Sequence, residues 1–234
     1  MVMYLTAKEK THGTSAKSTG EQPVAIRLLL AGGAIGPLLF IVVFLIEGAT
    51  RPHYSVWQDA VSALSLGEGG WMQITNFIVC GVLVFGFAIG LRLLLRTGHG
   101  STWGPILLGI FGLCLIGAGI FVTDPGLGYP YEASTITVTV HGTIHSLISL
   151  FAFISLPAAC FVLARRDAAD RASRGWAWYS VATGLLVVVF FVITVVVTAL
   201  NGPTGLTQRI FLIVGWSWIA VQAIRLMSKK APLA

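Results

Sequence analysis

Six apolar segments, each long enough to cross a lipid bilayer as a helix, constrain this chain more than any other feature of its sequence. A helix needs about 20 apolar residues to cross a hydrocarbon core of roughly 30 Å, and it satisfies its own backbone hydrogen bonds there. The segments lack the alternation of apolar and polar residues that is typical of strands. They lie at about residues 24–47, 71–95, 103–123, 140–164, 176–200 and 206–227. The sequence therefore predicts an all-α membrane protein, a bundle of six transmembrane helices.

The composition also excludes a water-soluble fold. Only 10% of the 234 residues are charged and 56% are hydrophobic, whereas soluble domains carry roughly 25% charged residues. The net charge of +6 does not indicate a nucleic-acid partner, because the basic residues form short clusters at the ends of the apolar segments. The expected location is the plasma membrane of a bacterial cell, as a multi-pass protein.

The basic residues predict how the helices are oriented. All but two of the 15 Lys and Arg residues fall on the side that holds both termini, and the exceptions are Arg51 and Arg209. Because positive charge is retained in the cytoplasm, we expect both termini to be cytoplasmic, with anionic lipids as partners at that face. We expect a disordered tail at residues 1–22, a transmembrane domain at 23–228 and a short C-terminal tail at 229–234.

The connections on the opposite side are longer and richer in polar residues. The first, at about residues 48–70, contains His53, Asp59 and Ser62. Apolar residues at helical spacing between positions 55 and 66 predict a short amphipathic helix on the outer membrane surface. An ordinary solvated turn is the alternative.

Asp124 stands where the third apolar segment ends, in the sequence Thr-Asp-Pro-Gly at residues 123–126. Pro and Gly stop a helix, so a plain turn explains this sequence. A carboxylate at the C-terminal end of a helix nevertheless lies at the unfavourable end of the helix dipole. The position therefore leaves room for a cation, a basic side chain or a metal ion beside Asp124.

Two histidines, His141 and His145, open the fourth apolar segment. Residues four apart share one face of a helix, and histidines within a span usually face the bundle interior. The pair could bind a zinc ion together with an oxygen of Asp124 or Asp59, although Gly142 stands where zinc proteases carry glutamate. A proton-responsive polar site and structural hydrogen bonds across helices are the alternatives.

Arg209 opens the sixth segment on the same outer side. We expect it either to pair with Asp59, Asp124 or Glu132 or to extend to the membrane surface. The candidate ligand-binding residues are His53, Asp59, Asp124, Glu132, His141, His145 and Arg209.

Short motifs are distributed along most of the chain. They are Gly36-Pro37-Leu38, Arg51-Pro52-x-Tyr54-Ser55 with Asp59 and Ser62, Asn76-Phe77, Thr123-Asp124-Pro125, the His141–His145 pair and Arg165-Arg166. In these motifs, over about residues 26–227, the chain resembles the domain of unknown function 998 family (DUF998) of bacterial and archaeal integral membrane proteins. The resemblance implies no particular activity, since none is assigned to that family.

A weaker similarity is to the ceramidase-like membrane hydrolases, in which a serine, an aspartate and histidines surround an intramembrane zinc ion. That resemblance implies Asp59, Ser62 and Asp124 as catalytic candidates, and His141, His145 and Asp124 as zinc ligands. Those enzymes have seven spans and carry the histidine pair in the last one, whereas this chain has six and carries its pair in the fourth.

Two functions compete on this basis. The first is an outward-facing polar pocket that binds a small molecule or a lipid, in a transport-like or sensing role. The alternative is a metal-dependent hydrolase at the outer leaflet, where a bound zinc ion would lower the pKa of its water. A structural subunit is a third possibility. The sequence contains no complete catalytic constellation, so the binding role is preferred.

Overall fold

The computed structural model describes residues 22–126, 129–131, 133 and 137–228. Within these ranges there are six long helices and no β-strand. The long helices are α1 (Val24–Thr50), α2 (Gly70–Leu94), α3 (Trp103–Ile120), α4 (Val140–Ala168), α5 (Arg174–Ala199) and α6 (Thr204–Ser228). Two short 3₁₀ helices, η1 (Val61–Ser65) and η2 (Arg171–Ser173), lie in the connections. Each of the six is long and apolar enough to cross a membrane, which confirms the six-helix prediction. The predicted tails, at residues 1–22 and 229–234, fall outside the described residues except for Gln22.

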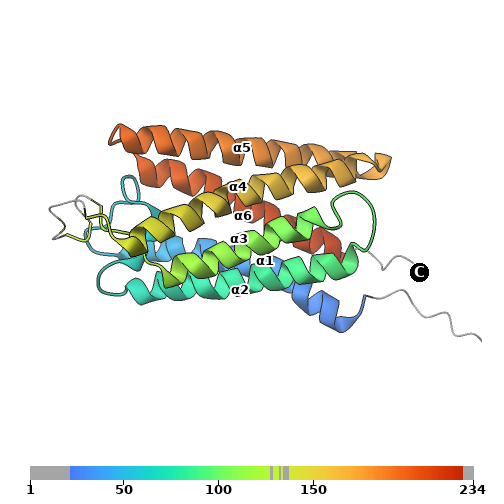
Figure 1. The fold of residues 1–234 in the computed structure, drawn as a ribbon, viewed down its shortest axis with the longest axis horizontal. Coiled ribbons are helices and arrows are strands. Elements are labelled where there is room, and N and C mark those ends of the chain that lie inside the picture. Colours follow the sequence, from blue (N-terminus) through green and yellow to red (C-terminus); the bar gives the residue numbers. More distant parts are fainter. Residues whose placement is uncertain (1–21, 127–128, 132, 134–136, 229–234) are drawn as a thin grey trace, which may run out of the picture.

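The six long helices form a closed ring. Each helix packs against its neighbours in sequence, and α6 packs against α1 to complete the ring. Figure 1 shows the helices lengthwise, from the side of the bundle. Successive helices run in opposite directions, so the two ends of the bundle hold different connections. One end holds the α1–α2, α3–α4 and α5–α6 connections, and the other holds the α2–α3 and α4–α5 connections. These are named here the outer end and the inner end, after the orientation that the basic residues predict.

Glycines bring the first three helices close together. A Cβ atom at Gly81 of α2 would lie 2.7 Å from the Gly112 carbonyl oxygen of α3. A Cβ atom at Gly32 of α1 would lie 2.6 Å from the Leu83 carbonyl oxygen of α2. Small residues are expected at such contacts, because helices in lipid associate through close packing rather than through the hydrophobic effect. Helices α1, α2 and α3 therefore form a tightly packed wall.

Arginines fasten the inner end. Arg225 of α6 forms a bidentate ion pair with Asp167 of α4, at 2.6 and 2.8 Å. The same guanidinium lies 4.6 Å from the ring centre of Trp176 in α5, within the range of a cation–π contact. Arg166 donates hydrogen bonds to two carbonyl oxygens of the α2–α3 connection. These contacts join α4, α5 and α6 at the inner end.

At the outer end, the predicted amphipathic α-helix is wrong. A turn followed by η1 takes its place, with Val61 and Leu64 buried in the bundle. The carbonyl oxygens of Val56 and Asp59 instead accept hydrogen bonds from Arg209 of α6, which docks this non-helical backbone against the bundle. A contact between segments that are far apart in sequence therefore overrides the local periodicity.

Candidate functional site

Arg209, near the start of α6, fastens the first outer connection to the bundle. Its Nη1 donates hydrogen bonds to the carbonyl oxygens of Val56 and Asp59, at 2.8 and 3.1 Å, and its Nη2 donates to the Tyr54 hydroxyl at 2.5 Å. Gly205 permits this approach, because a Cβ atom there would collide with the Asp59 carbonyl oxygen. Arg209 is 7% exposed and forms no ion pair with a described residue. The predicted pairing with Asp59 is therefore absent, and backbone carbonyl groups solvate the charge instead.

Arg51, the other basic residue on the outer side, holds the same connection from the end of α1. It donates hydrogen bonds to the carbonyl oxygens of Leu64 and Gly69, at 3.3 and 3.0 Å, and to that of Glu68. It also lies 3.4 Å from the Glu47 carboxylate. Both outer arginines thus direct most of their donors at the backbone between α1 and α2.

Asp59 lies in this connection, and one oxygen of its carboxylate is hydrogen-bonded to the backbone. The carboxylate accepts a hydrogen bond from the Ser55 backbone N–H at 2.6 Å. Burial raises the pKa of Asp59, and the Ser55 hydrogen bond and the charge of Arg209 oppose that rise. The Tyr54 hydroxyl lies 3.1 Å from the Asp59 carbonyl oxygen, and burial raises the pKa of Tyr54 to about 12. Tyr54 is therefore a neutral structural donor at physiological pH.

Asp124 belongs structurally to the beginning of α4 rather than to the end of α3. Its carboxylate accepts hydrogen bonds from the Thr139 backbone N–H at 3.0 Å and from the Thr139 hydroxyl at 2.6 Å. Thr139 is itself the N-cap of α4, and a Cβ atom at Gly142 would collide with the Asp124 carboxylate. The Thr139 hydrogen bonds lower the pKa of Asp124. Asp124 thus lies at the favourable N-terminal end of the next helix, and no described basic side chain pairs with it. A cation or metal ion beside it stays a prediction.

The two histidines of α4 lie in different surroundings although they are one turn apart. His145 is 4% exposed, and its Nδ1 lies 2.7 Å from the Phe121 carbonyl oxygen. A carbonyl oxygen can only accept, so Nδ1 carries the proton and Nε2 is left as an acceptor. His141 is exposed, with its ring centre 5.4 Å from that of Phe121. Only His145 of the pair points into the bundle.

No set of metal ligands is assembled in the described part of the chain. There, no three side chains of His, Cys, Asp or Glu lie close enough together to hold a metal ion. The Asp124 oxygens and Nδ1 of His145 already bond to protein groups. His53 packs instead against Tyr131, with ring centres 4.4 Å apart, and Glu132 lies outside the described residues. Zinc binding stays a prediction.

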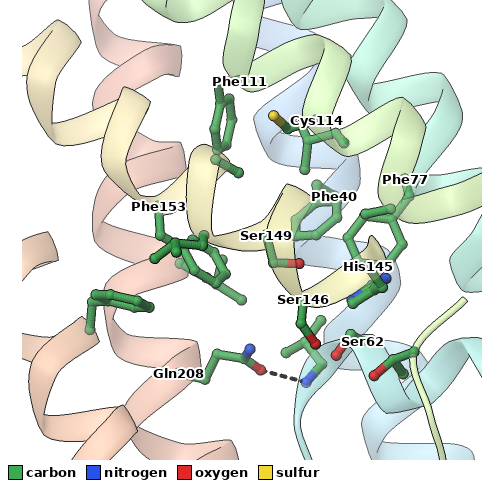
Figure 2. Close-up of a pocket in the computed structure, with 18 of the residues that line it drawn as sticks. Phe40, Ser62, Phe77, Phe111, Cys114, His145, Ser146, Ser149, Phe153 and Gln208 are labelled. Carbon is green, nitrogen blue, oxygen red and sulfur yellow. Dashed lines mark hydrogen bonds between the residues drawn. The ribbon is translucent and has the colours of Figure 1, made fainter. Parts of the chain in front are cut away.

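A cavity of about 350 Å³ lies inside the outer half of the ring, and all six long helices contribute to its wall. Its aromatic lining residues are Phe40, Phe77, Phe111, Phe153, Phe191 and Trp216. Its polar lining residues are Ser62, Thr123, His145, Ser146, Ser149 and Gln208. Figure 2 shows Ser62, His145 and Ser146 gathered toward one end, and Phe111 at the opposite end. The cavity therefore has a polar mouth, which Phe77 also borders, and a mainly aromatic interior.

A second hollow, the vestibule, adjoins the mouth of this cavity on the outer side. It has a volume of about 510 Å³, and both Asp59 and Asp124 line it. Ser62 and Thr123 line the vestibule and the cavity alike. The chain thus brings two carboxylates, a serine hydroxyl and the His145 imidazole around two adjoining hollows. The other described candidates, which line neither hollow, are His53, His141 and Arg209.

Comparison with protein families matches residues 34–225 to a family described as protein of unknown function, DUF998. The chain belongs to this family. The resemblance seen in the sequence motifs is confirmed. Neither the curated proteins nor the solved structures include a match. Of the motif residues of this DUF998 protein, Arg51, Tyr54, Asp59 and Asp124 all make the contacts that organise its outer end.

Several residues that line the cavity of the DUF998 protein are not among the candidates predicted from the sequence. Ser149, Gln208 and Trp216 line the cavity but carry no charge, so they did not stand out among the candidates. The sequence does contain a pattern that indicates Ser149. Ser146, Ser149 and Phe153 are spaced three and four residues apart, which places them on one face of a helix. Trp216 is fully buried and gives no such signal in the sequence alone.

Proposed function

We propose that this DUF998 protein binds a small amphiphilic molecule in its outer cavity, in a transport-like or sensing role. The strongest support for this proposal is the order in which charged, polar and aromatic side chains line the two hollows. Carboxylates line the vestibule. Hydroxyl and imidazole groups lie toward one end of the cavity and Phe111 at the other (Figure 2). The volume of about 350 Å³ falls within the range of roughly 300–1,000 Å³ that is typical of ligand pockets.

The mouth can both accept and donate hydrogen bonds. His145 lines the mouth, and in its neutral form Nε2 carries no proton because Nδ1 donates to the Phe121 carbonyl oxygen. The Gln208 side-chain oxygen accepts a hydrogen bond from the Val61 backbone N–H at 2.6 Å, which leaves the Gln208 amide protons as donors (Figure 2). Deeper in, the indole N–H of Trp216 has no hydrogen-bond partner among the described residues. A ligand with a polar group at one end fits this distribution.

The charges of the vestibule indicate what that polar group is. The pKa of Asp124 is lowered by the Thr139 hydrogen bonds, so its carboxylate is ionised at physiological pH. Neither Asp124 nor Asp59 forms an ion pair with a described residue. An amine or another hydrogen-bond-donating head group is therefore favoured over an anionic one.

The cavity also reaches the side of the bundle. Ser146 and Leu150 line it and are exposed on α4, Leu150 by 42%. Closer to the middle of the bundle, the rings of Phe153 in α4 and Phe191 in α5 are in contact, with their centres 5.3 Å apart. Pro157 interrupts the hydrogen bonding of α4, because it has no N–H to donate to the Phe153 carbonyl oxygen. This arrangement supports entry of the ligand from the outer leaflet, between α4 and α5.

Photolabelling of the purified full-length protein tests the proposal. The probe is a long-chain alkylamine that carries a diazirine at the end of its chain. We expect labelling of the aromatic interior, at Phe111 or Trp216, and a reduction of about tenfold in Ser149→Trp, whose indole would fill the cavity. Leu147→Trp, on the lipid-facing side of the same helix, is the matched control and should label as the wild type does. Equal labelling of the two variants would refute the proposal.

A metal-dependent hydrolase is the second candidate, and the position of Ser62 supports it. Ser62 lines the vestibule with Asp124 and the cavity with His145, so a hydroxyl, a carboxylate and an imidazole surround adjoining hollows. One zinc ion per chain, lost in the double variant His141→Ala, His145→Ala, would support this function. Purified protein that binds no divalent metal would exclude it.

A further inference from the structure

A groove with a volume of about 540 Å³ lies between α4 and α5 at the inner end, far from the outer cavity. Two helical stripes form it, each with residues three and four positions apart. The α4 stripe consists of Phe161, Ala164, Arg165 and Ala168, and the α5 stripe of Arg174, Ala177, Trp178 and Val181. Because the helices are antiparallel, Arg165 and Arg174 lie toward the inner end, and Phe161 and Val181 lie toward the middle of the membrane.

The two arginines of the groove differ from Arg166 and Arg225, which bind protein groups nearby. Arg166 donates hydrogen bonds to the α2–α3 connection, and Arg225 pairs with Asp167. Arg165 and Arg174 are exposed, and within the described chain neither forms a hydrogen bond or an ion pair. Two guanidinium groups at one rim, without protein acceptors, are suited to bidentate hydrogen bonds with a phosphate.

The remainder of the groove is suited to a hydrocarbon chain. Its floor consists of Ala164, Ala168 and Ala177, whose small side chains leave the space open, and Phe161 continues it toward the membrane centre. Trp178 is 74% exposed beside the arginines, at the level where aromatic rings favour the membrane interface. A free phosphate would leave this apolar surface without a partner, whereas a phospholipid covers both parts.

We infer that this groove binds an anionic phospholipid of the inner leaflet, with the phosphate between Arg165 and Arg174 and one acyl chain along Phe161 and Val181. The charge of the rim complements the anionic lipids that face the cytoplasm. The α5 N-terminus, at Arg174, adds the positive end of its helix dipole to the same rim. The site is independent of the outer cavity.

Native mass spectrometry of the full-length protein, titrated with phosphatidylglycerol in detergent, tests this inference. We expect the double variant Arg165→Gln, Arg174→Gln to bind phosphatidylglycerol about thirtyfold more weakly than the wild type, since each arginine near an anionic lipid contributes about a factor of five. The control Arg96→Gln, Arg171→Gln removes the same charge from exposed positions outside the groove and should change the affinity less than about twofold.

Three outcomes would overturn the inference. They are an equal loss in both double variants, binding of phosphatidylcholine as tight as that of phosphatidylglycerol, and displacement of the lipid by glycerol phosphate. The variant Ala164→Trp keeps both arginines but fills the groove, and it should also lose binding. Ser149→Trp, which fills the outer cavity, should bind phosphatidylglycerol as the wild type does, so that the two sites are tested separately.

Discussion

Replacing Arg209 with methionine should release the first outer connection from the bundle. The substitution keeps much of the apolar length of the side chain but removes hydrogen bonds to the carbonyl oxygens of Val56 and Asp59 and to the Tyr54 hydroxyl. A hydrogen bond to a charged group contributes about 1.5–3 kcal/mol. Water can reach the surface connection and replace part of this, so we take the lower value for the two backbone bonds. The free energy of local opening should therefore fall by about 3 kcal/mol.

Amide hydrogen exchange measures this opening directly. The Val61 amide bonds to Gln208 and the Leu206 amide bonds to the Trp57 carbonyl oxygen, so both report on whether the connection is docked. A loss of about 3 kcal/mol should speed their exchange about a hundredfold. Arg27→Met, which removes an exposed arginine at the inner end of α1, is the control and should leave both amides protected.

Arg209→Lys sharpens the test, because it keeps the positive charge and loses the planar fork that reaches several acceptors at once. We expect its exchange rates to fall between those of the wild type and of Arg209→Met. If Arg209→Met leaves Val61 and Leu206 as well protected as in the wild type, the connection does not depend on this contact. Equal acceleration in Arg209→Lys and Arg209→Met would show that geometry, not charge, carries the whole effect.

Three further predictions concern the outer end. The lowered pKa of Asp124 means that its contribution to stability is fully present above its usual pKa of 3.8 and is lost as the pH falls through the lower folded value. The protection factor of the Thr139 amide, which is the intrinsic exchange rate divided by the observed rate at the same pH, should therefore fall on acidification below about pH 4, and Asp124→Asn should remove that fall. Gly142→Ala should lower the melting temperature by placing a methyl group against the Asp124 carboxylate, and the additional change Asp124→Gly should recover part of the loss. An enzymatic reporter fused after Tyr129 should be active only outside the cytoplasm, and cytoplasmic activity would contradict the predicted orientation.

The helices could be predicted from the sequence because lipid leaves few alternatives. Every backbone group in the membrane needs an internal partner, so a long apolar segment indicates a helix without knowledge of its neighbours. The third span shows the limit of this argument. The apolar run predicts a span that extends to residue 123, whereas α3 ends at Ile120. Pro125 has no N–H to donate to the Phe121 carbonyl oxygen, and His145 of α4 binds that oxygen instead. The length of an apolar run therefore does not define where its helix ends.

The candidate site was only partly predictable for a related reason. Topology placed Asp59, Asp124 and His145 at one end of the bundle, and all three do line the adjoining hollows there. The partners of Arg209 are mainly backbone carbonyl groups, and every residue carries one, so no pattern of residue types could indicate them. The division between His141 and His145 likewise depends on how α4 is rotated about its axis in the ring, which spacing alone does not define.

The arrangement of the outer arginines explains how the vestibule can stay acidic. Two guanidinium groups lie at the outer end, and either could in principle neutralise Asp59 or Asp124. Arg209 and Arg51 instead direct most of their donors at backbone carbonyl groups, and their side-chain partners include the Tyr54 hydroxyl and Glu47. The Asp124 carboxylate is held by Thr139, which is neutral, so its hydrogen bonds fix its position without cancelling its charge. The backbone contacts that dock the first connection thereby leave the carboxylates of the vestibule available to a ligand that donates hydrogen bonds or carries positive charge.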